Sequence, residues 1–422
     1  MKIIPILKKA VVLLVSVFIL NILQTAVFPY LALGGVIPNL LLGAAWPVMH
    51  RELGVSSSLA GIITMIISAN TIISSLMSDR LTHRFRAEKV IVISVLTTAV
   101  SLFGFSISCQ FWMLCLWAIP YGLGAGAIDA ALNNYVALHC NSRQMSWLHC
   151  SWGIGASVSP YIMGGALTYG AGWQDGYRNV SGIQFVITLI LILSLPLWKA
   201  TPSRVEGIEE VKSSGPIALR DVVRIPGAVF LFIAFFAYCG LEATAMLWTS
   251  SYMVKAKSVP VETAATFGAL YVLGITAGRF ISGFIADKLG DRKMIRLGII
   301  FICIGLLTVL IPVKGTVFAV TGMLIAGFGS GPVYPFIIHA TPDNFGADKS
   351  QAIIGMQMAS AYVGSTFVPP LFGVIQGVVG IWLFPLFLII FLALLIIMTE
   401  ELNRTVKSGG CYGANRACGD VL

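Results

Sequence analysis

Twelve apolar stretches, each about as long as a helix that crosses a lipid bilayer, make up most of this chain. Glycine, proline and charged residues separate them. Inside a bilayer, a single segment satisfies its own backbone hydrogen bonds only as a helix. We therefore predict an all-α membrane protein with twelve transmembrane helices. The predicted spans are 25–48, 57–79, 89–108, 112–138, 146–170, 179–198, 227–254, 262–286, 292–312, 315–339, 348–374 and 377–400.

The overall composition excludes a soluble protein. Hydrophobic residues make up 57% of the chain and charged residues only 11%, whereas soluble domains carry about 25% charged residues. The net charge of +9 does not indicate a nucleic-acid partner, because its placement along the chain fits membrane topology. We expect the lipid bilayer as a partner and no nucleic acid.

The N-terminal region contains more apolar sequence than one span requires. Residues 10–49 form a continuous apolar run, and Lys2, Lys8 and Lys9 precede it. This order is typical of a signal peptide, but no cleavage site follows. We place the first span at 25–48 and treat 1–24 as an apolar extension, in which residues 10–24 form either a separate membrane helix or a continuation of the span.

Lysine and arginine lie mostly on one side of the predicted membrane. If the first span begins inside, the inner tails and loops hold 21 of the 27 and the outer loops hold 5. The positive-inside rule then places both termini in the cytoplasm of a cell membrane. The long polar stretch 199–226 is predicted to be a cytoplasmic linker between six-helix bundles at 25–198 and 227–400, and 401–422 is predicted to be a cytoplasmic tail.

Three groups of residues recur after 205 to 209 positions, in corresponding spans of the two halves. The first group has Gly-x-Gly-x-Gly followed by a polar residue, the second has Gly, Pro and Gly, and the third is a single aspartate. The pairs are Gly122, Gly124, Gly126 and Asp129 with Gly327, Gly329, Gly331 and Tyr334; Gly155, Pro160 and Gly164 with Gly364, Pro369 and Gly373; and Asp79 with Asp287. Such repetition predicts two pseudo-symmetric six-helix bundles, the plan of a secondary transporter with a cavity between repeats.

The segment from Gly283 to Lys293, Gly-Phe-Ile-Ala-Asp-Lys-Leu-Gly-Asp-Arg-Lys, resembles the major facilitator superfamily signature between spans eight and nine. Its counterpart after span two keeps Asp79-Arg80 but has Ser75 and His83 where glycines are expected. The resemblance implies the major facilitator fold, in which the two bundles rock about a central site. It also implies a cytoplasmic gate latch, and the alternative is that these charges are ordinary solvated loop residues. The latch residues would be Asp79, Arg80, Gly283, Asp287 and Arg292.

Within the superfamily, three segments are similar to the bacterial fucose-permease-like branch. They are Ile-Pro-Asn39-Leu-Leu-Leu-Gly-Ala-Ala-Trp46-Pro, Gly126-Ala-Ile-Asp129-Ala-Ala-Leu-Asn133-Asn134 and Ser146-Trp-Leu-His149-Cys-Ser-Trp152-Gly. Sugar permeases of that branch use one acid in span one and another in span four. This chain has Asp129 in span four but Asn39 in span one, and an amide cannot carry a proton.

Asp129 lies near the middle of a predicted span, and Asn133 lies one helical turn later on the same face. A charge at that depth costs roughly 3 kcal/mol on insertion scales, so it should face protein or a water-filled cavity. The neighbouring glycines Gly122, Gly124 and Gly126 leave room for another helix to pack closely. Asp129 either takes up and releases a proton during transport or is a structural group that Asn133 or a neighbouring helix holds in place.

Three further ionisable residues lie within the spans. Glu242 in span seven is either a second titrating or substrate-binding group, or it lies near the outer water interface or in an inter-helix hydrogen bond. His149 in span five is a candidate proton relay, because imidazole titrates near neutral pH, or a satisfied structural histidine. Arg279 in span eight pairs with an acid or binds an anion.

Other polar and aromatic residues of the spans are candidate substrate contacts, although most aromatic residues in such proteins pack helices or form interface belts. The candidates are Asn39, Trp46, Asn133, Asn134, Trp152, Trp248, Tyr271, Tyr334 and Gln357.

These features together favour a secondary active transporter that moves a small polar solute, such as a sugar, by alternating access. We expect coupling to protons through Asp129, Glu242 and His149, a monomeric state, no cofactor, no bound metal and no enzymatic activity. One alternative is a drug-efflux antiporter, because Gly155 to Gly165 shows a weak likeness to the antiporter signature of span five. Another is a sensor that kept the fold and lost transport.

Overall fold

The computed structural model describes residues 37–170, 172–198, 215–312 and 316–408. They belong to two compact units. Unit 1 comprises Met1–Arg204 with Arg279–Phe284, and unit 2 comprises Val205–Gly278 with Ile285–Leu422. The extension at 1–24, the start of the first span, residues 199–214 of the predicted linker and residues 409–422 of the predicted tail lie outside the described residues.

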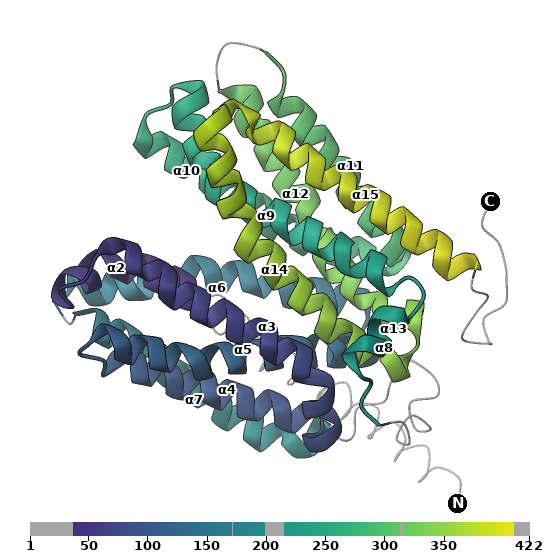
Figure 1. Cartoon of the computed structure of the whole chain (residues 1–422), viewed down its shortest axis with the longest axis horizontal. Helices are drawn as coiled ribbons and strands as arrows, with labels where there is room; N and C mark the ends of the chain where they lie inside the picture. Colours follow the sequence, from purple (N-terminus) through teal and green to yellow (C-terminus); the bar gives the residue numbers. More distant parts are fainter. Residues whose placement is uncertain (1–36, 171, 199–214, 313–315, 409–422) are drawn as a thin grey trace, which may run out of the picture. The chain divides into compact units, whose positions relative to one another are not determined.

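Unit 1 is built from long helices and one short 3-10 turn in the part that the structure describes (Figure 1). These elements are α2 (Ile37–Glu52), η1 (Ser57–Leu59), α3 (Ala60–Phe85), α4 (Ala87–Ser106), α5 (Phe111–His139), α6 (Ser142–Thr168) and α7 (Gly172–Trp198). Helix α5 packs against both α3 and α4, and α4 also packs against α7.

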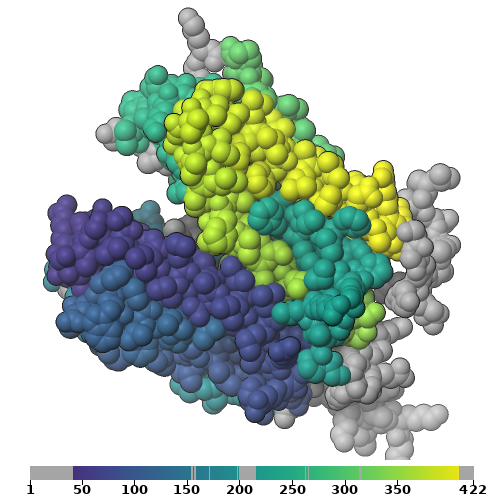
Figure 2. All heavy atoms as spheres, viewed as in Figure 1, coloured from purple at the N-terminus to yellow at the C-terminus, as the bar shows by residue number. Residues whose placement is uncertain are grey.

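Unit 2 repeats this composition with two additional short helices. Its elements are α8 (Leu219–Arg224), α9 (Ala228–Lys257), α10 (Val261–Leu289), α11 (Asp291–Val309), α12 (Val317–His339), α13 (Thr341–Phe345), α14 (Ala347–Val379), η3 (Ile381–Leu383) and α15 (Phe384–Ser408). The short piece Arg279–Phe284 of α10 is the exception, since it belongs to unit 1. In the space-filling view, side chains fill the space between α9, α14 and α15 (Figure 2).

The predicted all-α membrane fold is confirmed. No strand occurs among the described residues, and ten of their helices are long and apolar enough to cross a membrane. Large apolar side chains cover the outer surface, for example Leu193, which is 71% exposed, and Val186, which is 59% exposed. Many exposed large apolar side chains of this kind are favourable in lipid and unfavourable in water.

The glycine repeat of unit 1 explains why α5 approaches α3 and α4 so closely. A Cβ atom on Gly126 would lie 2.2 Å from the Thr71 carbonyl oxygen on α3, and one on Gly124 would lie 2.9 Å from the Ser94 carbonyl oxygen on α4. Backbone therefore packs directly against backbone, as the sequence predicted for these positions.

The matching glycines of unit 2 make the matching contacts. A Cβ atom on Gly327 would lie 2.3 Å from the Tyr271 carbonyl oxygen on α10, and one on Gly329 would lie 2.6 Å from the Gly298 carbonyl oxygen on α11. The repeat seen in the sequence is thus a repeat of helix packing inside each unit.

Two element boundaries differ from the sequence-based expectation. Helix α15 continues to Ser408, so the described part of the predicted tail is helical. The ion pair between Arg404 and Glu401, three residues apart, is of the kind that supports such an extension. Within the predicted linker, Leu219–Arg224 forms helix α8, whose Val222 is buried.

Candidate functional site

Helix α5 of unit 1 carries a polar pair. The Nδ2 atom of Asn133 donates a hydrogen bond of 2.9 Å to the Oδ1 atom of Asp129. Their spacing of four residues places both side chains on one face of the helix. Asp129 is half-buried, whereas Asn133 is only 1% exposed, so the pair lies between the interior of the unit and an accessible surface.

His149 on α6 extends this pair into a chain of three groups. Its Nε2 atom lies 3.0 Å from the Oδ1 atom of Asn133, and its side chain is 5% exposed. Because Asn133 donates its amide hydrogen to Asp129, its amide oxygen accepts from His149, which therefore carries a hydrogen on Nε2. Asn133 links the carboxylate to the imidazole.

Arg279 lies on the other side of His149, within the α10 piece that belongs to unit 1. Its Nη1 atom donates to the His149 carbonyl oxygen over 3.2 Å, and its guanidinium carbon lies 5.0 Å from the centre of the Trp152 ring. Stacking on an aromatic face is a common way to hold a desolvated guanidinium. The Arg279 side chain is 3% exposed. Unit 1 therefore buries a guanidinium next to His149, which Asn133 connects to the Asp129 carboxylate.

The same piece of α10 is fastened to α6 by small residues. The Ser146 hydroxyl donates to the Arg279 carbonyl oxygen over 2.7 Å and lies 2.8 Å from the Ser282 hydroxyl. At Gly283 a Cβ atom would lie 2.2 Å from Nε1 of Trp147. The absence of a side chain at Gly283 is therefore required by the position of the Trp147 ring.

Three further candidates belong to the first half of the chain: Trp46, Asn134 and Asn39. Trp46 is buried in the apolar core of unit 1 and donates from Nε1 to the Ser57 carbonyl oxygen over 2.7 Å. These contacts connect α2 to the 3-10 turn η1. Asn134 is buried on α5. Asn39 lies in the first turn of α2, and its side chain is outside the described residues.

Unit 2 contains a second carboxyl-centred group on α9. The Tyr238 hydroxyl lies 2.9 Å from Oε1 of Glu242 and 2.8 Å from the Ser330 carbonyl oxygen on α12. The Ser330 hydroxyl in turn lies 3.2 Å from the Tyr271 hydroxyl on α10. Glu242 therefore belongs to a hydrogen-bonded group that joins three helices of its unit.

The Tyr238 hydroxyl carries one hydrogen and faces two acceptors when Glu242 is ionised. A protonated Glu242 would instead donate to the Tyr238 oxygen, and Tyr238 would donate to Ser330. Protonation of this carboxyl thus changes which atom Tyr238 binds. Tyr238 was not among the residues predicted from the sequence, although its position four residues before Glu242 was a usable signal.

The remaining unit 2 candidates pack among other side chains. Trp248 donates from Nε1 to the Pro369 carbonyl oxygen over 3.0 Å, and the Tyr334 hydroxyl lies 3.4 Å from the Met358 sulfur. Gln357 is fully buried, and its Oε1 atom accepts from the Thr341 hydroxyl over 3.1 Å. Of these three, Tyr334 adjoins the Glu242 group, since its ring lies 6.2 Å from that of Tyr238.

The two predicted latch segments have different environments. Asp79 is 5% exposed, and its Oδ1 atom lies 3.3 Å from Nδ1 of His83, while Arg80 is exposed. Asp287 is exposed, and Arg292 donates to Oδ1 of Asn344 over 3.2 Å. The degraded first segment thus holds its aspartate inside the bundle, whereas the intact second segment presents it at the surface.

The described part of unit 2 also has two polar side-chain pairs that were not predicted from the sequence. Nδ1 of His339 lies 2.6 Å from Oδ2 of Asp291, and Arg296 binds Glu400 through two hydrogen bonds of 3.0 and 2.8 Å. The partners of these pairs are 48 and 104 residues apart, so no local pattern reveals them. Among the described residues, no three His, Cys, Asp or Glu side chains form a group that could hold a metal ion.

Comparison with known proteins gives one family. Residues 27–369 and 230–409 match the profile of the Major Facilitator Superfamily. The chain is 24% identical over 390 residues to the probable nitrate/nitrite antiporter NarK1 of Thermus thermophilus, with 84% of this chain and 85% of that protein covered. It is 23% identical over 312 residues to the hexuronate transporter of Bacillus subtilis, with 69% and 73% covered.

A solved structure shares the fold at low sequence identity. The fucose:proton symporter FucP of E. coli superposes with a TM-score of 0.71 at 15% identity, and 90% of this chain and 97% of that chain are covered. At this level of identity the likeness concerns the arrangement of the helices.

Proposed function

Since this chain belongs to the major facilitator superfamily, whose members are membrane transporters and not enzymes, we propose that it is a proton-linked secondary transporter for a small polar solute. The observation that carries this proposal is the hydrogen-bonded chain Asp129–Asn133–His149 inside unit 1. A carboxylate and an imidazole are both groups that exchange protons in transporters. Asn133 couples their positions, so a proton on Asp129 alters the hydrogen bonds that reach His149.

In this proposal Asp129 is the primary proton carrier, and Glu242 is a second one in the other unit. Asn133, Asn134, Trp152 and Tyr334 are proposed to contact the solute, together with Asn39. Buried amides and aromatic faces suit a hydroxyl-rich solute, because they supply both hydrogen bonds and stacking surfaces. A sugar fits this description.

The topology belongs to the same proposal. The protein would be a monomeric transporter in a cell membrane, with both termini in the cytoplasm. Its two bundles, at 25–198 and 227–400, would be joined by 199–226 and would open the central site to each side of the membrane in turn. The residues Asp79, Arg80, Gly283, Asp287 and Arg292 would act as the cytoplasmic latch. The lysine and arginine distribution supports this orientation.

A second candidate cargo is a small anion, and Arg279 is the observation that favours it. Its guanidinium is buried beside His149 and stacked on Trp152, and a buried guanidinium is a strong ligand for carboxylate or nitrate groups. NarK1 and the hexuronate transporter are named for anionic cargo. Arg279→Lys keeps the charge but loses the planar fork, so it would raise the KM for an anionic solute far more than for a neutral sugar.

A drug-efflux antiporter and a sensor without transport would each behave differently in sealed vesicles. The antiporter would move lipophilic cations out of vesicles. The polar Asp129–Asn133–His149 chain favours a polar cargo over a lipophilic one. A sensor that kept the fold would change conformation with its ligand without carrying it across the membrane.

The test uses the full chain in sealed lipid vesicles that contain a pH-sensitive dye. A panel of sugars and small carboxylates is added to wild type, to Asp129→Asn and to a matched control, Asp221→Asn, which removes an exposed carboxylate on α8. We expect one solute to drive a pH change in wild type and control that Asp129→Asn abolishes. If a solute is instead taken up equally by all three proteins and no pH change accompanies its uptake, proton coupling is contradicted.

A further inference from the structure

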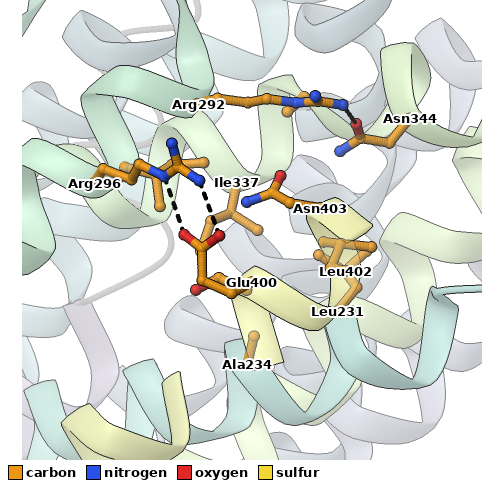
Figure 3. A pocket seen from close by; sticks show the side chains of 12 residues that line it. Leu231, Ala234, Arg292, Arg296, Ile337, Asn344, Glu400, Leu402 and Asn403 are labelled. Atoms are coloured by element: carbon orange, nitrogen blue, oxygen red, sulfur yellow. Dashed lines mark hydrogen bonds and ion pairs between the residues drawn. The ribbon is translucent and has the colours of Figure 1, made fainter. Parts of the chain in front are cut away.

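One end of unit 2 contains a pocket whose lining includes Arg292, a residue of the proposed latch, together with residues to which the transport mechanism assigns no role. It lies between α9, α11, α12 and α15, with two arginines along one wall and apolar side chains opposite (Figure 3). It is lined by Leu231, Ala234, Arg292, Ile295, Arg296, Ile337, Ala340, Asn344, Thr399, Glu400, Leu402 and Asn403.

The charged groups of the pocket leave it net positive. Arg296 uses its Nε and one Nη to hold both carboxylate oxygens of Glu400, at 3.0 and 2.8 Å. Arg292 is exposed and donates one hydrogen bond of 3.2 Å, to the neutral amide of Asn344. Two guanidinium groups therefore accompany one carboxylate among the lining residues, and the guanidinium outside the ion pair, that of Arg292, is on an exposed side chain.

The pocket lies where the exposed apolar side chains of α11 and α15 give way to charged residues. On α15 the lipid-facing residues Ile390 and Ile397 are 63% and 55% exposed, and Glu400 follows within one turn. On α11 the exposed Ile300 lies one turn beyond Arg296. Both partners of the Arg296–Glu400 pair are thus just outside the apolar band.

These three features agree with one class of ligand. We propose that this pocket binds a phosphate group, with the phosphodiester of a membrane phospholipid as its source, or a free phosphate monoester of the same chemistry. Guanidinium groups bind phosphate oxygens through paired hydrogen bonds, and basic pockets between membrane helices are typical headgroup sites. The amides of Asn344 and Asn403 add neutral donors, and Leu231 and Leu402 give the glycerol and first acyl carbons an apolar wall.

Such a ligand would join elements that are distant in the sequence. A phosphate held by Arg292 on α11 and by Asn403 on α15 would add to the Arg296–Glu400 pair, which already connects these two helices. Bound lipid would therefore make unit 2 more resistant to unfolding.

The experiment measures lipid binding to the purified full chain in detergent by native mass spectrometry. The probes are phosphatidylglycerol, phosphatidylethanolamine, a diacylglycerol with the same acyl chains, and sn-glycerol 3-phosphate as a competitor. The variants are Arg292→Gln and the matched control Arg404→Gln, which removes an equal charge from α15 at a residue outside the pocket lining. Thermal unfolding without added lipid establishes that both variants fold like wild type.

We expect the two phosphate-bearing lipids to bind at least about tenfold more weakly to Arg292→Gln than to wild type or Arg404→Gln, since a charge-assisted hydrogen bond is lost. Displacement of bound lipid by glycerol phosphate at a similar concentration would assign the site to free phosphate esters, and failure to displace it would assign the site to the lipid. Equally tight binding of diacylglycerol, or equal weakening by Arg404→Gln, would overturn the proposal. If Arg292→Gln fails to fold, Asn403→Leu provides the same test from the opposite helix.

Discussion

The Nε2 atom of His149 lies 3.0 Å from the Oδ1 atom of Asn133, which joins α6 to the Asp129 carboxylate on α5. The amide can serve both neighbours because it has a donor end and an acceptor end. A side chain without both ends would break the connection while leaving the two helices in place.

Replacing Asn133 by leucine tests this connection directly. Leucine has nearly the same size but no hydrogen-bonding group, so the link between Asp129 and His149 is lost. We expect solute-driven proton movement in vesicles to fall by at least about tenfold, which is the effect of losing a hydrogen bond to a charged group. Asn179→Leu, at an exposed position of α7, is the control, and an unchanged proton signal in Asn133→Leu would show that the link is only structural.

His149→Gln separates a proton relay from a structural histidine. Glutamine can donate to Asn133 as the imidazole does, but it does not titrate. We expect the variant to fold normally and the pH dependence of its transport rate to differ from that of wild type, because glutamine has no titrating proton. The measurement is the initial rate of solute uptake as a function of pH, and a profile identical to wild type would assign His149 a structural role.

Tyr238→Phe removes the hydroxyl that contacts both Glu242 and the Ser330 carbonyl oxygen. We expect the variant to lose about 1–3 kcal/mol of stability, because at least one buried acceptor loses its donor. Thermal unfolding in detergent measures this loss against Tyr252→Phe, a buried tyrosine on the same helix whose ring stacks near Phe384.

The same tyrosine variant also reports on the role of Glu242. If protonation of Glu242 redirects the Tyr238 hydrogen bond, Glu242→Gln and Tyr238→Phe act on one group, and their effects on stability will not add. Additive effects would mean that the two side chains act independently.

Gly126→Ala tests the close packing between α5 and α3. The added Cβ atom would lie 2.2 Å from the Thr71 carbonyl oxygen, so the helices would have to separate. We expect a loss of roughly 1–3 kcal/mol, as for overpacked cores in general, visible as a lower melting temperature. Gly165→Ala on α6 is the matched control, because nothing lies within 4 Å of its added Cβ atom, and equal melting of the two variants would contradict the packing argument.

Several features of this protein follow from the sequence alone because they depend on local or periodic properties. The apolar spans require helices in a membrane, and the recurrence of Gly124 as Gly329 predicts the same packing in both halves. The Asp129–Asn133 contact follows from a spacing of four residues on one helix. Each of these conclusions requires only the helix period, the bilayer thickness and the residue types. None of them requires knowing which helices are neighbours in the fold.

The tertiary structure decided the contacts between helices. His149 meets Asn133 from another helix, Tyr238 reaches Ser330 across 92 residues, and Arg296 meets Glu400 across 104. It also placed Trp46, a predicted substrate contact, in the apolar core of unit 1. The physical reason is that such contacts depend on the rotation and depth of each helix against its neighbours, which the packing of many side chains sets together and which no single stretch of sequence determines.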